Sequence, residues 1–443
     1  MSTQTIDIES LAYGGDGVGH LADGRVAFVA GAFAGDVVRA SFADDGKSFV
    51  RARLDELVEA SPERVEPPCA AAAAGLCGGC PWAQLAYDAQ LAWKRRSVAD
   101  AFVRIGGFTS ERVECLLAPT VASARQWGYR NKVEFEVGQD VAGRMTLGMH
   151  ARGGSFAPLA SCKLCAGTLE KAPKALTGAL RYALSDSDTQ LLRVGLRHSR
   201  RTSATEVAIW TTPGRFPRAA VAKVVPQALA AKHVGVTRVM LKGSAKQRKV
   251  AGVESLAGRG FWAERIGEYE MRISAPSFFQ VNTAGAETLV TLVLEALEPS
   301  GLDTVLDLYA GAGTFTLPLA QRAGGVVAVE MAGSSVRDLR RNLERAGLDA
   351  EVVGGDVGRE LAALGAADSV VVDPPRAGLG AQALEGLSAL AAHRIAYVSC
   401  NPTTLARDVA ALCSGGYELR AVTPVDLFPQ SYHVECVAVL ERA

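Results

Sequence analysis

Three short polar motifs follow hydrophobic segments in the carboxyl-terminal half of this 443-residue chain. They are Asp307-Leu-Tyr-Ala-Gly-Ala-Gly313, Asp373-Pro-Pro-Arg376 and Ser399-Cys400-Asn401-Pro402. Ligands of open α/β sheets bind outside the carboxyl ends of the strands, so we expect the three motifs to converge in one crevice. Cys400 ends its predicted strand and precedes an exposed turn signal, a position where a cysteine can act as a nucleophile.

The first motif predicts a loop that packs its backbone closely against a ligand. Residues 303–308 are expected to form a buried strand, Gly311 and Gly313 a tight turn, and residues 315–323 the following helix. A dinucleotide fingerprint needs a third glycine where Thr316 stands, and no phosphate-binding Lys-Ser or Lys-Thr pair follows the turn. Pyrophosphate is therefore not the expected ligand.

Two acids follow the next strands of the same half. Glu330 ends a strand expected at 326–329, and Asp356 lies at the end of the third strand. A glycine turn followed by these acids fits the adenosine part of S-adenosylmethionine, which carries ribose hydroxyls and a sulfonium but no phosphate. Each acid taken alone is more typical of a solvated strand end.

The second motif predicts a rigid clamp for a substrate. Paired prolines fix their own backbone and hold Asp373 out of helical geometry. Methyltransferases that act on exocyclic amines of planar bases place an aromatic residue after a similar Pro-Pro turn, and Arg376 takes that place here. An ordinary proline loop is the alternative interpretation.

The nine cysteines indicate a second site rather than a disulfide framework. The chain is long enough for full hydrophobic cores and begins with no apolar signal segment, so we expect a reduced, cytoplasmic protein. Cys69, Cys77 and Cys80 form a metal-ligating array, and Cys162 and Cys165 supply candidates for a fourth ligand. From spacing alone, zinc and an iron–sulfur cluster fit equally well.

The charge balance excludes a global basic field. Lysine plus arginine and aspartate plus glutamate both number 47, so RNA binding would rest on local basic segments. The segment 125–132 combines cations with two aromatic rings that could stack on bases. Other candidate phosphate contacts are Lys94-Arg95-Arg96, residues 193–201 and Lys246-Gln-Arg-Lys249.

The pattern along the chain predicts three parts. Residues 1–60 alternate between apolar and polar positions around glycine turns, which predicts a small antiparallel β-barrel. Residues 61–265 predict a central α+β part with a helix at 87–105 and an antiparallel sheet. Residues 266–443 alternate strands and helices, which is typical of an α/β doubly wound, Rossmann-like domain.

Five motifs occur in one order: Phe278-Phe279-Gln280-Val281-Asn282, the three motifs above and His433-Val434-Glu435. In this order they resemble the RNA uracil-5-methyltransferases. The resemblance covers nearly the whole chain, because the first 60 residues resemble that family's small RNA-binding TRAM barrel. It implies an enzyme that methylates carbon 5 of a uridine with S-adenosylmethionine as the donor.

The resemblance gives two residues chemical roles. Cys400 would add as a thiolate to carbon 6 of uracil, because carbon 5 alone is too poor a nucleophile to accept the methyl group. Glu435 would then remove the carbon 5 proton, and an enclosed apolar site that raises its pKa would make it a stronger base. His433 receives no catalytic role.

The resemblance also assigns ligand-binding residues. Ala310 and Thr314 depart from the cysteine and asparagine that family members often have, and neither departure removes a group that the reaction needs. The residues placed around the methyl donor or the target base are Gln280, Tyr309, Glu330 and Asp373, with Thr314 and Asp356 as weaker candidates. The residues implied as ligands of a four-iron four-sulfur cluster are Cys69, Cys77, Cys80 and Cys162.

The expected substrate is ribosomal RNA of the 23S type, because family members with both the barrel and the cluster tend to act on it. Transfer RNA is the alternative. A noncatalytic, metal-containing RNA-binding or assembly protein is the alternative from a different class, and it would need neither Cys400 nor the donor motifs. We expect a monomer with RNA as its partner and no association with membranes.

Overall fold

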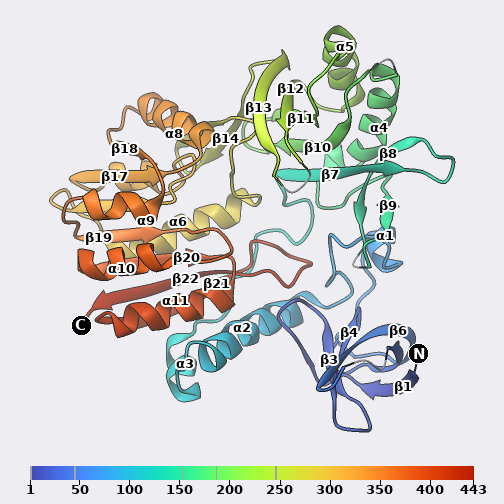
Figure 1. Ribbon diagram of the computed structural model, residues 1–443, viewed down its shortest axis with the longest axis horizontal. Helices are drawn as coiled ribbons and strands as arrows, with labels where there is room; N and C mark the ends of the chain where they lie inside the picture. The colour runs from blue at the N-terminus through green and yellow to red at the C-terminus, as the bar shows by residue number, and fades with distance from the viewer. Residues whose placement is uncertain (1, 44–45, 152, 186, 245–246) are drawn as a thin grey trace.

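The computed structural model of the protein describes residues 2–43, 46–151, 153–185, 187–244 and 247–443. Three β-sheets of six, seven and seven strands form three lobes, and a two-stranded ribbon joins the second to the third (Figure 1). Within the described ranges, no helix has the length and apolar character needed to cross a bilayer.

The amino-terminal lobe is a six-stranded sheet in the order β1-β5-β6-β4-β3-β2. Alternating positions of β4 and β5 place Ala27, Val29, Val38 and Ala40 in one small core. Neighbouring strands are antiparallel, as predicted, except for β4 and β6, which are parallel. The strands are β1 (Ser2–Asp7), β2 (Ser10–Leu11), β3 (Gly17–His20), β4 (Val26–Ala30), β5 (Val37–Phe42) and β6 (Phe49–Glu59).

The helix predicted at 87–105 is α2 (Tyr87–Arg104). Val98 and Phe102 on one of its faces join the hydrophobic core of the carboxyl-terminal sheet. The helix precedes the central sheet in sequence but packs against α11 (Pro402–Ser414) and β21 (Tyr417–Val425) (Figure 1). Its neighbours along the chain are α1 (Ala70–Ala73) and α3 (Ser110–Leu116).

The central lobe is a seven-stranded sheet in the order β13-β12-β11-β10-β7-β8-β9, antiparallel except for the pair β11 and β12. Two helices cover it and bury Leu176 and Val221 against Phe135 and Val194. The elements are β7 (Lys132–Gln139), β8 (Met145–His150), β9 (Phe156–Pro158), a 3-10 helix (Gly167–Leu169), α4 (Ala172–Ala183), β10 (Leu191–His198), β11 (Ala204–Thr211), α5 (Arg218–Ala228), β12 (His233–Lys242) and β13 (Lys249–Ala257).

The ribbon of β14 (Trp262–Ile266) and β15 (Tyr269–Ile273) leads into the carboxyl-terminal sheet, whose order is β18-β17-β16-β19-β20-β22-β21. The first five strands of this order are parallel and β22 is antiparallel. The structure therefore has the doubly wound α/β fold that the sequence predicts.

Helices lie on both faces of this sheet (Figure 1). The predicted helix at 315–323 is shorter, because the chain tightens after Ala320 into a turn in which Arg322 N donates to Leu319 O at 2.9 Å. The remaining elements are α6 (Thr283–Leu297), β16 (Thr304–Leu308), α7 (Thr316–Ala320), β17 (Gly325–Glu330), α8 (Gly333–Ala346), β18 (Glu351–Gly354), α9 (Val357–Glu360), a 3-10 helix (Leu361–Ala363), β19 (Ser369–Val372), α10 (Ala381–Leu390), β20 (Arg394–Ser399) and β22 (Glu435–Arg442).

Candidate active site

The candidate active site lies at the carboxyl ends of β16, β19 and β20, which are parallel neighbours. Gln280 Nε2 donates a hydrogen bond to Asp373 Oδ2 at 3.4 Å. The charges of Glu435 and Asp373 both raise the pKa of Cys400. The structure therefore brings Gln280, Asp373, Cys400 and Glu435 together, although they come from four separate segments of the chain.

The glycine turn after β16 and the end of β17 are held together by Glu330. Gly311 N donates to Glu330 Oε2 at 2.9 Å, and Ala332 N donates to Glu330 Oε1 at 2.6 Å. Each carboxylate oxygen keeps a lone pair for a further donor such as a ribose hydroxyl. The turn needs glycine at position 313, where the φ angle is +100° and a Cβ would lie 2.5 Å from Leu317 Cδ1.

Tyr309 has a strained backbone beside this turn. Its φ angle is +65°, which is uncommon for a bulky residue and typical of functional loops. Burial and the charge of Asp356 raise its pKa to about 12, so the phenol stays neutral. Asp356 is exposed just before α9, and Thr314 is half-buried in the turn. Tyr309, Thr314, Glu330 and Asp356 thus lie around one loop, and their role in binding the donor stays a prediction.

A chain of four carboxylates lines the site. Burial, with a smaller contribution from the charge of Glu330, raises the pKa of Asp307 to about 7, although a hydrogen bond from Thr316 lowers it. Burial also raises the pKa of Asp373 to about 7, with Asp307 as the next cause. Asp373 in turn raises the pKa of Glu435. The site is therefore an acidic environment in which a bound cation would be favoured.

Arg376 is the cation that faces Cys400. Burial, followed by the charge of Glu435, raises the pKa of Cys400 to about 11, and the positive charge of Arg376 acts in the opposite direction. The Arg376 carbonyl accepts bonds from Asn401 Nδ2 at 3.0 Å and Thr404 Oγ1 at 3.3 Å. Asn401 also caps α11 through Thr403 N, so the helix start after Cys400 holds the Pro-Pro loop in place.

Glu435 is 3% exposed at the start of β22, and its Oε2 atom has no hydrogen-bond partner within the described residues. Burial is the first cause of its raised pKa, followed by the charge of Asp373, whereas Arg376 lowers it. A raised pKa is the direction expected for Glu435 if it acts as a base. His433 lies two residues earlier, and burial lowers its pKa to about 4, so its ring is neutral.

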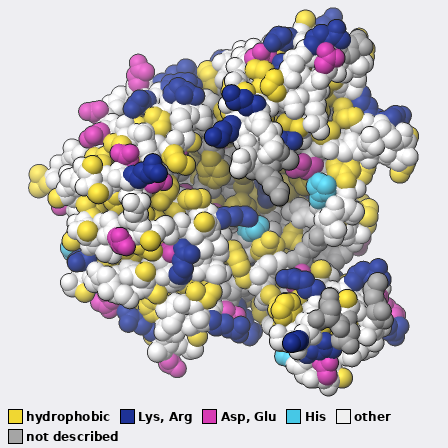
Figure 2. Space-filling model, in the orientation of Figure 1, with side chains coloured by type: hydrophobic (Ala, Val, Ile, Leu, Met, Phe, Trp, Pro, Cys, Tyr) yellow, Lys and Arg dark blue, Asp and Glu magenta, His cyan; other side chains and the backbone are white. Residues whose placement is uncertain are grey.

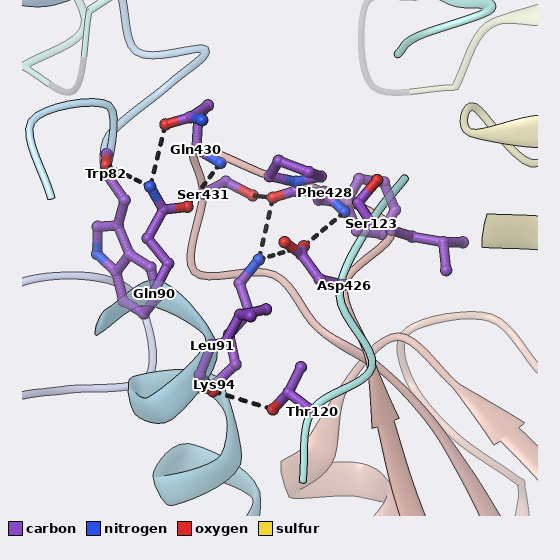
Figure 3. A network of polar contacts seen from close by, with 12 residues as sticks. Trp82, Gln90, Leu91, Lys94, Thr120, Ser123, Asp426, Phe428, Gln430 and Ser431 are labelled. Atoms are coloured by element: carbon purple, nitrogen blue, oxygen red, sulfur yellow. Dashed lines mark hydrogen bonds and ion pairs between the residues drawn. The ribbon is translucent and has the colours of Figure 1, made fainter. Parts of the chain in front are cut away.

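A buried polar network fixes the loop between β21 and β22, which leads to Glu435 (Figure 3). Lys94 Nζ on α2 donates to Asp426 Oδ1 at 2.5 Å and to the Phe428 carbonyl at 3.1 Å. Gln90 accepts from Gln430 N at 2.8 Å and donates to Gln430 Oε1 at 3.0 Å. Helix α2 thus holds the loop that leads to Glu435 from outside the sheet.

The amino-terminal lobe reaches the same loop. The hydroxyl of Tyr13, between β2 and β3, donates to the Cys400 carbonyl at 3.3 Å. Its ring packs edge-on against Tyr432, with the centroids 5.9 Å apart. Gly15 has a φ angle of +83°, and a Cβ there would lie 2.7 Å from Tyr432 Cδ1. The first lobe therefore touches the backbone of the candidate nucleophile.

The four predicted cluster ligands Cys69, Cys77, Cys80 and Cys162 line one small cavity between α1 and the segment before α4. Cys165 is buried beside them and does not line it. As the side chains stand, no group of three or more His, Cys, Asp or Glu in the described residues is arranged to hold a metal ion. The thiols converge, and the metal itself stays a prediction.

The structure corrects one predicted RNA contact. Lys94 is fully buried and ion-paired with Asp426, so it does not reach a phosphate. Its position on the inner side of α2 explains the difference, since a run of three cations on a helix cannot all face solvent. Arg95 is bonded to Glu114. Lys246 lies outside the described residues.

The sequence gives no sign that Tyr13 and Tyr432 belong to the site, and it suggests no separate role for Asp307 or for Arg376 beside Cys400. Asp307 stands in a strand pattern that looks like ordinary core, although its Oδ1 atom has no partner among the described residues. The sequence signal for Arg376 was its place after the Pro-Pro turn. Tyr13 carries no signal beyond the glycines that follow it.

Comparisons with known proteins show what the chain is similar to. The family model for tRNA (uracil-5-)-methyltransferases matches residues 224–353 and 361–443. An uncharacterized RNA methyltransferase of Gloeobacter violaceus is 37% identical over 100% of this chain and 97% of its own length. Another, of Chlorobaculum tepidum, is 34% identical over 96% of this chain and 93% of its own length.

A solved structure is similar over the full length. The Pyrococcus abyssi tRNA (uracil-54, C5)-methyltransferase in complex with S-adenosyl-L-homocysteine superimposes with a TM-score of 0.74 and 26% identity. The match covers 99% of this chain and 100% of that chain. The chain belongs to the tRNA (uracil-5-)-methyltransferase family and is an RNA methyltransferase.

Proposed function

We propose that this enzyme transfers the methyl group of S-adenosylmethionine to carbon 5 of a uridine through a covalent adduct between Cys400 and carbon 6. The observation that carries the proposal is the pairing of a half-buried thiol with a buried carboxylate at one point of the crevice. Glu435 Oε2 has no partner among the described residues, so it is free to bind a proton from a substrate.

The protein's residues divide the reaction into addition and elimination. Cys400 Sγ, as a thiolate, bonds to carbon 6, and the electrons of the carbon 5–carbon 6 double bond pass to the oxygen at carbon 4 as an enolate. S-adenosylmethionine supplies the methyl group for carbon 5. Glu435 then takes the carbon 5 proton, the double bond reforms, and the Cys400 sulfur leaves carbon 6 with its electron pair.

Two features of the site assist these steps. Burial, followed by the charge of Glu435, raises the pKa of Cys400 to about 11, and Arg376 acts against this shift by favouring the thiolate. The raised pKa of Glu435 makes its carboxylate a better acceptor for the carbon 5 proton. Carbon 6 of a stacked uridine is inaccessible to a thiolate, so the target base must leave its stack.

The donor is proposed to bind between the Gly311 turn and the acidic residues. Glu330 would accept bonds from the ribose hydroxyls, and Tyr309 would lie along the donor. Asp356, Thr314 and Gln280 are assigned to the same pocket by their places around the loop. The acidic character of the pocket supports a ligand that carries a positive sulfonium.

A four-iron four-sulfur cluster is proposed at the cavity lined by the four cysteines. Four thiolates from two segments that face a shared cavity support this donor set. Zinc is the alternative for four thiolates. Anaerobic reconstitution distinguishes them: about four irons and four sulfides per chain would support the cluster, and a single zinc without sulfide would refute it.

Ribosomal RNA is proposed as the substrate, with the amino-terminal lobe as a TRAM-like RNA-binding module in a cytoplasmic, monomeric enzyme. Transfer RNA is the second candidate, and the full-length similarity to the Pyrococcus abyssi enzyme favours it.

The test is transfer of labelled methyl from S-adenosylmethionine to unmodified ribosomal and transfer RNA. Wild type should produce 5-methyluridine, Cys400→Ala should produce none, and Cys413→Ala, a half-buried cysteine on α11, should retain activity. Mass spectrometry of RNA fragments identifies the labelled RNA. RNA binding without transfer by the cluster-loaded wild type would refute the proposal and favour a binding or assembly role.

A further inference from the structure

A second cavity, of about 130 Å³, lies between the central sheet and the amino end of α6. Its lining includes Arg125, Arg130, Asn131 and Arg200 from the central lobe, and Thr283 and Ala284 from the first turn of α6. None of the proposed catalytic or donor-binding residues lines it.

Four arginines and one carboxylate, that of Glu264, line this cavity, so its charge is positive overall. Glu264 accepts hydrogen bonds from Ser199 Oγ at 2.6 Å and from Thr283 Oγ1 at 2.8 Å. Arg201 is ion-paired with Glu287, whereas within the described residues no ion pair neutralises Arg125, Arg130 or Arg200. Arg200 donates twice to the Gly128 carbonyl, at 3.0 and 3.2 Å, which fixes its guanidinium beside the cavity. Figure 2 shows Lys and Arg side chains bordering the hollow between the lobes.

The amino end of α6 adds to this field. The helix is 15 residues long, and Asn282 caps it by accepting a bond from Gly285 N at 3.2 Å. The first-turn amides of Thr283 and Ala284 have no acceptor within the helix and carry the positive end of its dipole. Helix amino ends of this kind bind phosphate groups.

Asn131 supplies the second, independent observation. Its side chain is 5% exposed, and its Nδ2 atom donates to the Gln280 carbonyl at 2.8 Å and to Thr283 Oγ1 at 2.9 Å. These two acceptors fix the orientation of the amide. Its Oδ1 atom has no partner among the described residues. A buried acceptor without a donor is costly unless a ligand supplies one.

Resting on the proposed RNA methylation, we propose that this cavity binds one ribonucleotide of the substrate RNA beside the target uridine. Arg125, Arg200 and the amino end of α6 hold its phosphate. Asn131 Oδ1 accepts a hydrogen bond from a ribose hydroxyl or a base N–H of the same nucleotide.

Two hydrogen bonds through Gln280 connect the cavity to Asp373 in the candidate active site. Asn131 is bonded to the carbonyl of Gln280, and the side chain of Gln280 is bonded to Asp373. A nucleotide in the cavity therefore sits one hydrogen-bonded residue from the crevice. We expect the nucleotide bound in this cavity to determine which neighbouring uridine reaches Cys400.

The test uses the full-length, cluster-loaded enzyme and an RNA fragment that the wild type methylates. Single neutral methylphosphonate linkages are placed in turn on either side of the target uridine. One linkage should raise the wild-type KM by about fivefold or more, and Arg125→Ala/Arg200→Ala should be insensitive to that linkage. This variant should also raise KM for unmodified RNA about 10- to 100-fold and lower the salt dependence of binding, with kcat within about threefold.

The matched control is Lys174→Ala/Lys223→Ala, which removes two exposed charges from α4 and α5 of the same lobe. If the arginine variant behaves like this control, or stays sensitive to every linkage, the proposal is overturned. If the wild type methylates no RNA, the proposed function fails instead.

A 2′-deoxy substitution at the sensitive nucleotide identifies the donor. A further rise in KM of about fivefold would show that a ribose hydroxyl donates to Asn131 Oδ1. A loss seen only when the base N–H groups are methylated shows a base donor. No loss in either case would refute the role of Asn131.

Discussion

S-adenosylmethionine should bind more tightly as the pH rises, whereas S-adenosylhomocysteine should not. Asp307 and Asp373 both have pKa values raised to about 7 by burial, so they are about half ionised near neutrality. A bound sulfonium stabilises their charged forms and lowers these pKa values. Binding then releases protons, and affinity increases as the pH rises through the pKa of the free enzyme.

The size of the effect follows from the electrostatics of the site. A cation about 5 Å from one carboxylate gains roughly 3 kcal/mol at an effective dielectric constant near 20. The upper limit is the cost of the pKa shift itself, from 3.8 to about 7 for Asp373, which corresponds to about 4 kcal/mol. We therefore expect the affinity to rise between about tenfold and a few hundredfold from about pH 5.5 to about pH 8.5.

Titration calorimetry of both ligands across this pH range is the assay. S-adenosylhomocysteine is the matched control because it has the same adenosine and amino-acid parts without the sulfonium charge. Asp373→Asn should flatten the pH dependence of S-adenosylmethionine binding. Equal pH slopes for the two ligands, or an unchanged slope in Asp373→Asn, would refute the electrostatic account.

Four further perturbations have defined outcomes. Glu435→Gln should slow turnover by about 100- to 10,000-fold and let an RNA–protein adduct accumulate on denaturing gels, and an unchanged rate would exclude it as the base. Cys400→Ala should abolish that adduct while gel-shift assays show RNA still bound. Lys94→Met should cost about 3–5 kcal/mol of unfolding free energy in urea because Asp426 is left buried and charged, and adding Asp426→Asn should recover part of it. Tyr13→Phe should lower kcat about fivefold with little change in stability, and no change in kcat would reduce this contact to packing.

The sequence predicted the catalytic sheet well because its strands are short apolar runs that end in polar motifs. The sequence predicts a strand at 326–329, and β17 covers Gly325–Glu330. The helix at 87–105 was also correct to within one residue. The packing of this helix was not predictable, because periodicity identifies a helix but not the surface against which it packs. Lys94 is therefore buried, whereas the sequence predicts an exposed cation there.

The candidate site was predictable where one motif supplies both the element and the group. Cys400 and Asp373 follow directly from the ends of β20 and β19. Contacts between distant segments left no such signal. Tyr13 meets Cys400 across 387 positions of sequence, and the charge of Asp307 is perturbed by burial that only the folded sheet creates.

The segment Arg130-Asn131 connects the cavity lined by the four cysteines to Gln280 of the candidate active site. Arg130 forms isolated bridges with both Cys165 and Asn282, and its amide donates to the Leu164 carbonyl at 3.2 Å. The residue after it, Asn131, binds the Gln280 carbonyl. A metal centre at the neighbouring cysteines would therefore stabilise the backbone that holds the second cavity and Gln280. Because Cys400 and Glu435 are anchored separately by α11 and the Lys94 network, loss of the metal should weaken RNA binding more than the chemical step.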